Sequence, residues 1–314
     1  MILIFGGTGF VGSHISELLV KNGHEVVLAS RSKNMKNIRS FQEKVRIEQV
    51  DITDPVQIAK LIERFQPEVI YHLAGQLTTY ESFEKPLYDV DVNSRSTLAM
   101  LEAARKLKHC RFILGSTFWV VGRPSTLPIN EDTPCNPLNI YAANRLASEH
   151  FCKIYHQVYD LDTVIIRLTN TFGPREQFDN KKKGAINYLI KKGVDEGEIP
   201  IYDKGMFFRD IMYVTDVALA AYVVQTKGKP GNLYFLGTGK KTWFYDLGEW
   251  IAQYTGCKVK YIESPDYHKR INVGNIIVDN SKLRSLGWNY KVSVKDGIRL
   301  TTQSYLDELK NVAQ

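Results

Sequence analysis

The sequence has few cysteines, no long hydrophobic run and no low-complexity segment. The four cysteines among its 314 residues show neither a CxxC pair nor metal-ligand spacing, so we expect reduced thiols and no metal site. The longest apolar run, residues 217–224, falls far short of the ~20 residues that a membrane-spanning helix needs. The first residues lack the basic segment of a secretory signal, and glycines interrupt them at once. These absences predict a cytoplasmic protein with no membrane partner.

Positive charge is in modest excess but is spread along the chain. Lys and Arg number 41 against 34 Asp and Glu, which gives a net charge of +7 and a pI near 9.0. The densest basic run is only the three lysines at 181–183. A nucleic-acid-binding protein more often gathers such charge on one stripe with interleaved aromatic residues. The diffuse pattern argues against a nucleic-acid partner and fits a protein that handles an anionic small molecule.

Short apolar runs alternate with longer helical patterns through the first 170 residues. Near-continuous apolar strands are typical of a parallel sheet that is covered by helices on both faces. We therefore predict an α/β fold with a Rossmann-type, doubly wound parallel sheet. The predicted strands are residues 2–5, 25–29, 45–50, 69–73, 112–114 and 163–167, and the predicted helices are residues 11–22, 56–65, 87–107 and 141–159.

The pattern changes after residue 170, where turn residues and charges increase. We predict a dinucleotide-binding domain over residues 1–170 and a smaller mixed α/β C-terminal substrate lobe over residues 171–314. Within that lobe, part of residues 214–236 is expected to return to the main sheet.

A glycine-rich run directly follows the first predicted strand and opens the first predicted helix. Residues 5–12 read FGGTGFVG. Gly6 permits the tight turn, Gly9 lets the backbone approach a pyrophosphate, and Gly12 allows the helix to pack closely on the strand. The helix N-terminus, which begins at Phe10 and Val11, offers oriented N–H groups to an anion. The run predicts dinucleotide binding, with an ordinary strand–helix turn as the alternative.

The end of the second strand bears on the choice of cofactor. NAD-binding proteins usually carry an acidic residue there, which accepts hydrogen bonds from the adenosine ribose. Residues 29–32 instead read ASRS, and Arg31 can pair with a ribose 2′-phosphate. This favours NADP over NAD, and the alternative is a solvated arginine beside NAD.

Further motifs follow in a fixed order. Residues 71–75 read YHLAG, residues 115–117 read GST, and Tyr141 follows 24 residues later. Residues 167–174 read RLTNTFGP, and residues 209–214 read RDIMYV. In this order and spacing, the motifs resemble those of the extended short-chain dehydrogenase/reductase family that modifies nucleotide sugars.

The resemblance implies an enzyme that transfers a hydride reversibly between a nicotinamide cofactor and a sugar carbon, with C4 the expected position. It assigns Tyr141 as the general acid/base and Thr117 as the hydroxyl that shares the reacting oxygen. A phenol with its ordinary pKa of about 10 is a poor base at neutral pH, so this chemistry requires a nearby cation. Arg145, one helical turn after the tyrosine, occupies the place of that cation.

The resemblance also assigns ligand contacts and a homodimer. The implied cofactor contacts outside the glycine run and Arg31 are Asp51, Ile52, Leu73, Ala74, Gly75, Asn93, Tyr141 and Arg145. The implied contacts to a nucleotide-diphosphate sugar are Thr117, Asn170 and Arg209, with Arg270 a weaker candidate. The two helices predicted at 87–107 and 141–159 are expected to pair across a dimer, where apolar surface would come from Ala99, Leu101, Ala103, Leu146, Phe151 and Ile154.

Two departures from the family pattern limit the reactions that the chain is expected to catalyse. The usual YxxxK reads YAANR at 141–145, and an arginine keeps the charge but cannot relay a proton. Phe118 and Trp119 follow Thr117 where the family's dehydratases carry an acidic residue. We therefore expect a 4-ketoreductase, 4-dehydrogenase or 4-epimerase. The alternatives are a 4,6-dehydratase whose acid comes from elsewhere and a non-catalytic NAD(P)-binding regulatory protein.

Overall fold

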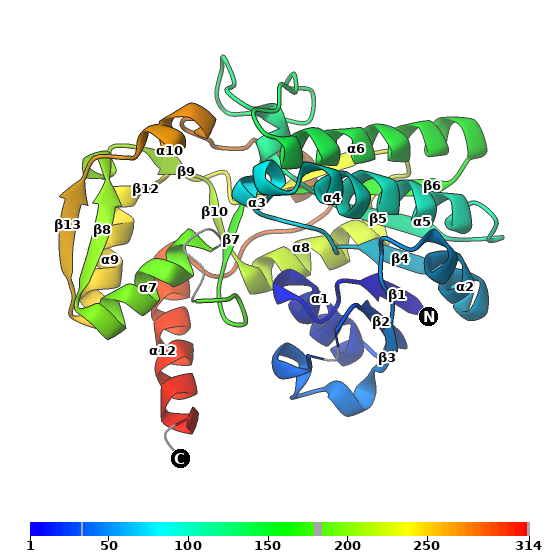
Figure 1. Ribbon diagram of the computed structural model, residues 1–314, viewed down its shortest axis with the longest axis horizontal. Coiled ribbons are helices and arrows are strands. Elements are labelled where there is room, and N and C mark those ends of the chain that lie inside the picture. The colour runs from blue at the N-terminus through cyan, green and yellow to red at the C-terminus, as the bar shows by residue number, and fades with distance from the viewer. Residues whose placement is uncertain (33, 179–183, 313–314) are drawn as a thin grey trace.

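The computed structural model describes residues 1–32, 34–178 and 184–312, and the lysine run at 181–183 lies outside this part (Figure 1). Its centre is a seven-stranded parallel sheet with the order β11-β6-β5-β4-β1-β2-β3. All six predicted strands form, and the predicted Rossmann-type fold is confirmed. The strands of this sheet are β1 (Ile2–Phe5), β2 (Val26–Ser30), β3 (Arg46–Gln49), β4 (Val69–His72), β5 (Arg111–Thr117), β6 (Asp162–Leu168) and β11 (Leu233–Leu236).

Helices cover both faces of the sheet. On one face α1 (Phe10–Lys21) packs against α8 (Val214–Lys227), and on the other α2 (Pro55–Phe65) packs against α5 (Ser96–Ala104), with α6 (Ile140–Tyr159) beside α5. Successive strand residues enter opposite cores, as Leu3 and Ile4 do. The two-sided burial explains why β1 and β2 are apolar at almost every position, whereas the edge strand β3 is mostly polar and has no fully buried residue.

The helix predicted at 87–107 is interrupted. The chain forms α3 (Thr79–Glu84), α4 (Pro86–Val90), a π-helical segment η3 (Asp91–Arg95) and then α5, which ends at Ala104. The hydroxyl of Ser96 donates to the carbonyl of Val92 at 2.7 Å, and that of Thr97 donates to the carbonyl of Asn93 at 2.9 Å. These two hydroxyl groups therefore bond to backbone carbonyls of the π-helical segment. Single-turn π-helical bulges inside helices often lie at functional sites.

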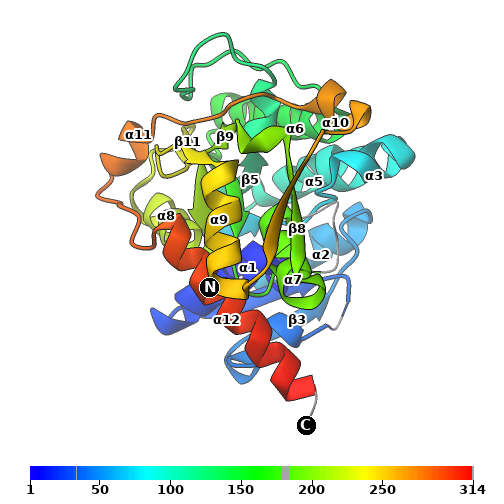
Figure 2. The same cartoon turned by 90° about the vertical axis from the view of Figure 1, so that its left-hand side faces the viewer.

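A second group of elements forms the C-terminal lobe, which Figure 2 shows in front of the sheet. Its strands pair two by two, and its helices α7, α9 and α12 pack around a separate apolar core. The strands are β7 (Asn170–Phe172), β8 (Glu198–Tyr202), β9 (Phe208–Arg209), β10 (Ile211–Tyr213), β12 (Thr242–Trp243) and β13 (Lys258–Ile262). The helices are α7 (Ala185–Glu196), α9 (Phe244–Thr255), α10 (Asp266–Ile271), α11 (Ser281–Arg284) and α12 (Val294–Val312).

Segments of the C-terminal half also join the main sheet. The strand β11 pairs in parallel with β6, and α8 lies on the sheet against α1. Over the residues described, none of the helices combines the length and apolarity needed to cross a membrane.

Candidate active site

The predicted site residues of the first half lie at the carboxyl ends of the parallel strands. Gly6, directly after β1, has φ +85, and a Cβ there would lie 2.7 Å from the backbone nitrogen of Ala74 after β4. A Cβ on Gly12 would lie 2.1 Å from the carbonyl oxygen of Gly6. Any larger side chain at these two positions would therefore push the turn away from α1 and β4. The glycines keep the turn closed against both elements.

The N-terminus of α1 is open to a ligand. Gly9 is the N-cap residue, and no side chain among the described residues caps the helix there. The N–H groups of Phe10 and Val11 therefore lie in a first turn that has no intrahelical acceptors. Such a turn binds phosphate readily because its N–H groups and the helix dipole both favour an anion.

Arg31 follows β2 and is held by another part of the domain. Its Nη1 donates to the hydroxyl of Tyr88 on α4 at 2.7 Å. Both side chains line a pocket of about 710 Å³. The other lining residues are Gln76, Glu81, Glu84, Lys85, Pro86 and Leu87. Two cations, Arg31 and Lys85, thus share this pocket with two carboxylates.

Asp51 and Ile52 follow β3 and are half-buried. The Oδ1 atom of Asp51 accepts from the backbone nitrogen and the hydroxyl of Thr53, at 2.9 and 2.8 Å. These bonds close the turn after β3 and place both residues at the same sheet edge as Leu73, which follows β4.

Arg145 forms a buried polar cluster with Asn93 and the backbone at Gly75. The arginine is 1% exposed, and its Nη2 donates to the carbonyl of Ala74 at 3.2 Å. A Cβ on Gly75 would lie 2.3 Å from both Arg145 Nη2 and Asn93 Oδ1, and Gly75 has φ +157. Arg145 Nε and Nη1 and Asn93 Oδ1 have no hydrogen-bond partner among the described residues. Two N–H donors and one amide oxygen acceptor thus lie together, and these atoms fit a ligand with hydroxyl groups.

Tyr141 and Arg145 lie on one face of α6. The side chain of Asn139 caps the helix by accepting from Ala142 N at 2.8 Å, which places Tyr141 in its first turn. The guanidinium carbon of Arg145 lies 5.8 Å from the centre of the Tyr141 ring. Tyr141 is 7% exposed. An arginine that cannot lose its proton therefore adjoins the tyrosine.

Thr117 ends β5, and α6 packs on this strand. It is 6% exposed, and its hydroxyl accepts from Trp119 N at 3.3 Å. The hydroxyl proton therefore remains available to donate to a ligand. Phe118 is 2% exposed and its ring lies 5.4 Å from that of Trp119. Aromatic rings thus fill the two positions after the threonine.

A buried ion pair connects α6 to β5 and β6. Glu149, two turns after Tyr141 on the same helix face, accepts from Ser116 Oγ at 2.5 Å and from both Nε and Nη2 of Arg167, at 2.9 and 2.7 Å. Burial alone would lower the pKa of Arg167, but the hydrogen bonds and charge of Glu149 outweigh it and raise that pKa. Since Ser116 directly precedes Thr117, this pair holds α6 in register with the end of β5.

The predicted substrate residues of the lobe are only partly brought together. The backbone nitrogen of Asn170 donates to the carbonyl of Asp210 at 3.3 Å, so Asn170 lies beside Arg209. Arg209 is 7% exposed, and burial lowers its pKa to about 10. Its Nη2 donates to Asn272 Oδ1 at 2.7 Å. Arg270 is exposed on α10, and the residue in contact with Arg209 is Asn272 instead.

Sequence reasoning missed Asn272, Tyr88 and Lys85. None of them belongs to a motif, and each reaches the site because distant segments fold side by side. The one available signal was the repeated Asn at 272 and 275 in a segment of irregular structure, since asparagine side chains commonly bond to the backbone in turns.

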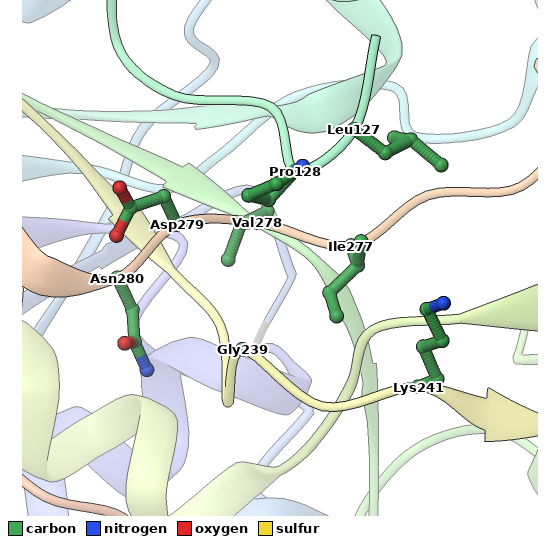
Figure 3. Close-up of a pocket in the computed structure, with 8 residues that line it drawn as sticks. All are labelled: Leu127, Pro128, Gly239, Lys241, Ile277, Val278, Asp279 and Asn280. Carbon is green, nitrogen blue, oxygen red and sulfur yellow. The ribbon is translucent and has the colours of Figure 1, made fainter.

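A separate pocket of about 330 Å³ lies where three segments meet (Figure 3). Leu127 and Pro128 come from one segment, Gly239 and Lys241 from a second, and residues 277–280 from a third. Figure 3 shows Lys241 and Asp279 on opposite sides, with Ile277 and Val278 between them. This pocket includes none of the predicted site residues.

Comparison with known proteins gives a consistent result. Residues 2–237 match the model of the NAD dependent epimerase/dehydratase family. The chain is 32% identical to a putative UDP-glucose 4-epimerase of Methanocaldococcus jannaschii, over 95% of this chain and 96% of that protein. It is 29% identical to a dTDP-glucose 4,6-dehydratase of Salmonella typhimurium, over 97% and 92% of the two chains. A crystal structure of a UDP-glucose 4-epimerase from Thermotoga maritima with UDP-glucose is similar, with a TM-score of 0.91, 26% identity, and coverage of 98% and 99%.

Proposed function

Because the chain belongs to the NAD-dependent epimerase/dehydratase family, we propose that it is a nucleotide-diphosphate-sugar 4-epimerase or a 4-ketoreductase/4-dehydrogenase that transfers a hydride reversibly at C4. The predicted resemblance to the extended short-chain dehydrogenase/reductase family is confirmed, and so is the prediction that the chain is an enzyme. The observation that carries the choice of reaction is that the aromatic rings of Phe118 and Trp119, in place of an acid, follow Thr117 at the end of β5. Tyr141 and Arg145 lie on α6, which packs on this strand.

The residues at the sheet edge fit a nicotinamide dinucleotide. The glycine turn and the open first turn of α1 would hold its pyrophosphate. The unpaired atoms of Arg145 and Asn93 would meet the hydroxyls of a ribose. When bound, the nicotinamide accepts or returns the hydride of the sugar carbon.

The chain's own side chains carry the proton. Tyr141, as tyrosinate, would take the proton of the sugar hydroxyl and give it back on the return step. Thr117 would donate a hydrogen bond to the same oxygen, and the charge of Arg145 would stabilise the tyrosinate by Coulomb attraction. Because a guanidinium does not lose its proton, exchange with solvent must use a route other than Arg145.

Arg209 and Asn170 would hold the diphosphate of the substrate. Arg209 is buried, and no ion pair within residues 1–32, 34–178 and 184–312 includes it, so its charge is not already neutralised. An arginine can bind a diphosphate through two charge-assisted hydrogen bonds. Asn170 would add an amide donor from the neighbouring strand.

Dehydration is the alternative within the same family. Sequence identity does not decide between the reactions, since an epimerase at 32% and a dehydratase at 29% are about equally similar. Phe118 and Trp119 cannot exchange a proton at neutral pH, whereas loss of water from C6 requires an acid and a base. This favours hydride transfer without dehydration. A non-catalytic regulatory protein would be expected to have lost Tyr141 and Thr117, and both are present.

The experiment that tests the proposed function is incubation of the purified protein with UDP-glucose and, separately, dTDP-glucose in deuterated water. We expect products that keep the 6-hydroxyl and carry no deuterium at C5, either as the C4 epimer or as a 4-keto sugar. A 4-keto-6-deoxy product would contradict the assignment and establish the dehydratase alternative.

We further propose that NADP is preferred over NAD. The support is the absence of an acid at the end of β2 and the presence of Arg31 beside Lys85 in one pocket. Arg31→Asp should weaken binding of NADP at least tenfold more than binding of NAD, since only NADP has a 2′-phosphate to lose, and one charged contact is worth about that factor. Titration calorimetry with both cofactors measures this. Tight binding of NAD and none of NADP by the unmodified protein would refute the preference.

A homodimer through α4, α5 and α6, which cover the two helices predicted to pair, is also proposed. Of the apolar residues predicted to supply that surface, Leu101 and Ala103 are buried inside the subunit, Ala99, Leu146 and Phe151 are half-buried, and Ile154 is 49% exposed. Leu87 at 80% and Val158 at 61% add to the exposed apolar surface of Ile154. These three lie on helices that pack side by side, α4 and α6 (Figure 1). Light scattering should give twice the chain mass of 35.9 kDa, and a monomer at micromolar concentration would contradict this.

A further inference from the structure

Arg123 is bonded to the backbone around the C-terminal end of α10 (Asp266–Ile271). Its Nε donates to the carbonyl of Asn272 at 3.0 Å, and its Nη2 donates to the carbonyls of Lys269 and Arg270 at 3.1 and 3.0 Å. Carbonyl groups at a helix C-terminus have no intrahelical donors, and a cation there is also favoured by the helix dipole. One guanidinium thus satisfies three carbonyls around the end of this short helix, which lies at the upper edge of the lobe in Figure 1.

Arg123 itself comes from the segment that follows Thr117. The chain runs from Thr117 through η4 (Phe118–Val121) to Gly122, which has φ +70 and leaves no room for a Cβ because Asn136 O would lie 1.9 Å away. The backbone is therefore tightly placed where Arg123 begins. The hydrogen bonds of Arg123 therefore connect the segment after Thr117 to α10.

The segment that Arg123 contacts is also hydrogen-bonded to Arg209. Asn272 Oδ1 accepts from Arg209 Nη2 at 2.7 Å and from Gly274 N at 3.0 Å. The next residues run along β9, where Asn275 Oδ1 accepts from Phe208 N at 3.0 Å. The position of the Arg209 guanidinium thus depends on Asn272, and the position of Asn272 depends on Arg123.

We propose that Arg123 is a positioning residue for the diphosphate of the substrate: it fixes the end of α10 and, through Asn272, the guanidinium of Arg209. The inference rests on the proposed function, because it takes a nucleoside diphosphate as the group that Arg209 binds. Arg123 is expected to act on binding only, since within the described part of the chain its hydrogen bonds go to the backbone around the end of α10 and not to Tyr141 or Arg145. Its loss should therefore affect KM and leave the rate at saturation intact.

The kinetic test compares Arg123→Met with Arg123→Lys. Arg123→Met keeps much of the side-chain length but removes the donors, and it should raise KM for the nucleotide sugar about fivefold to tenfold while changing kcat less than about twofold. Arg123→Lys retains a charge at the helix end and should recover part of the affinity. Arg64→Met is the matched control, because Arg64 is an exposed arginine of α2 that, among the described residues, forms an ion pair with Glu48 alone, at 3.5 Å. A fall in kcat with unchanged KM would overturn the proposal.

Hydrogen exchange of residues 266–276 in the free protein supplies a readout that needs no substrate. Arg123→Met should speed exchange there, whereas Arg209→Ala should raise KM at least tenfold with a smaller effect on exchange at the start of α10. Unchanged exchange in Arg123→Met overturns the inference whatever the kinetics show. Faster exchange with an unchanged KM overturns the connection to the diphosphate.

The proposed function fails if the unmodified protein binds none of UDP-glucose, dTDP-glucose, UDP and dTDP. The diphosphate role of Arg123 then fails with it. The exchange result still decides whether Arg123 holds the end of α10.

Discussion

Tyr141→Phe should lower kcat by about 10²- to 10⁴-fold, the usual contribution of a positioned general acid/base. The substitution removes one hydroxyl and keeps the ring, which is 7% exposed in the first turn of α6. Packing is therefore preserved, and the affinity for the dinucleotide should change little. The measurement is kcat with a saturating nucleotide sugar, together with the dissociation constant of the cofactor.

The chain provides its own control for this prediction. Tyr254 and Lys258 have the same spacing of four residues, but Tyr254 lies on α9 and packs against the core of the lobe. Tyr254→Phe should leave kcat unchanged. If Tyr141→Phe retains full activity, or if both variants lose activity alike, Tyr141 is not the acid/base.

Arg145→Met should lower kcat at saturating cofactor at least tenfold. In the proposed mechanism the guanidinium next to the Tyr141 ring stabilises the tyrosinate, and a change of about tenfold corresponds to 1.4 kcal/mol of that attraction. The variant also leaves Asn93 without a charged neighbour at the ribose, so the affinity for the cofactor should fall as well. Measurement of kcat at saturating cofactor, together with the dissociation constant of the cofactor, separates the two effects.

Arg145→Lys is the informative companion variant. A lysine keeps the charge and should retain much of the rate. It lacks the planar guanidinium that can donate to two ribose hydroxyls at once. If Arg145→Met retains the full rate at saturating cofactor, the arginine does not support the tyrosinate and the proposed mechanism is contradicted.

Much of the fold could be predicted from local sequence. The strands β1, β2 and β4 are largely apolar and buried, and the glycine turn after β1 has a steric requirement that a single motif expresses. The lengths of α4 and α5 could not be predicted, since the π-helical segment around Asn93 depends on hydrogen bonds of Ser96 and Thr97 that helical periodicity does not reveal.

The site residues divide in the same way. Tyr141, Thr117 and Arg145 were assigned by the family resemblance, and the structure places them in the first turns of α6 and at the end of β5. Their catalytic roles stay predictions. Asn272 and Arg123 lie 149 residues apart and meet only because the lobe folds back over the sheet. Arg270 was chosen by its approximate place in the chain, and a short helix such as α10 turns neighbouring side chains in different directions.

The central claim is that the protein moves a hydride from C4 of a nucleotide sugar and that Tyr141 moves the accompanying proton. The most direct measurement uses UDP-glucose and dTDP-glucose labelled with deuterium at C4, followed by rapid acid quench and mass spectrometry of the dinucleotide that the protein retains. With the unmodified protein we predict a chemically reduced dinucleotide that carries deuterium, and a sugar that keeps its 6-hydroxyl. With Tyr141→Phe we predict much less of the labelled dinucleotide. A dinucleotide that stays unlabelled with both sugars, or one labelled equally in Tyr141→Phe, would contradict the claim.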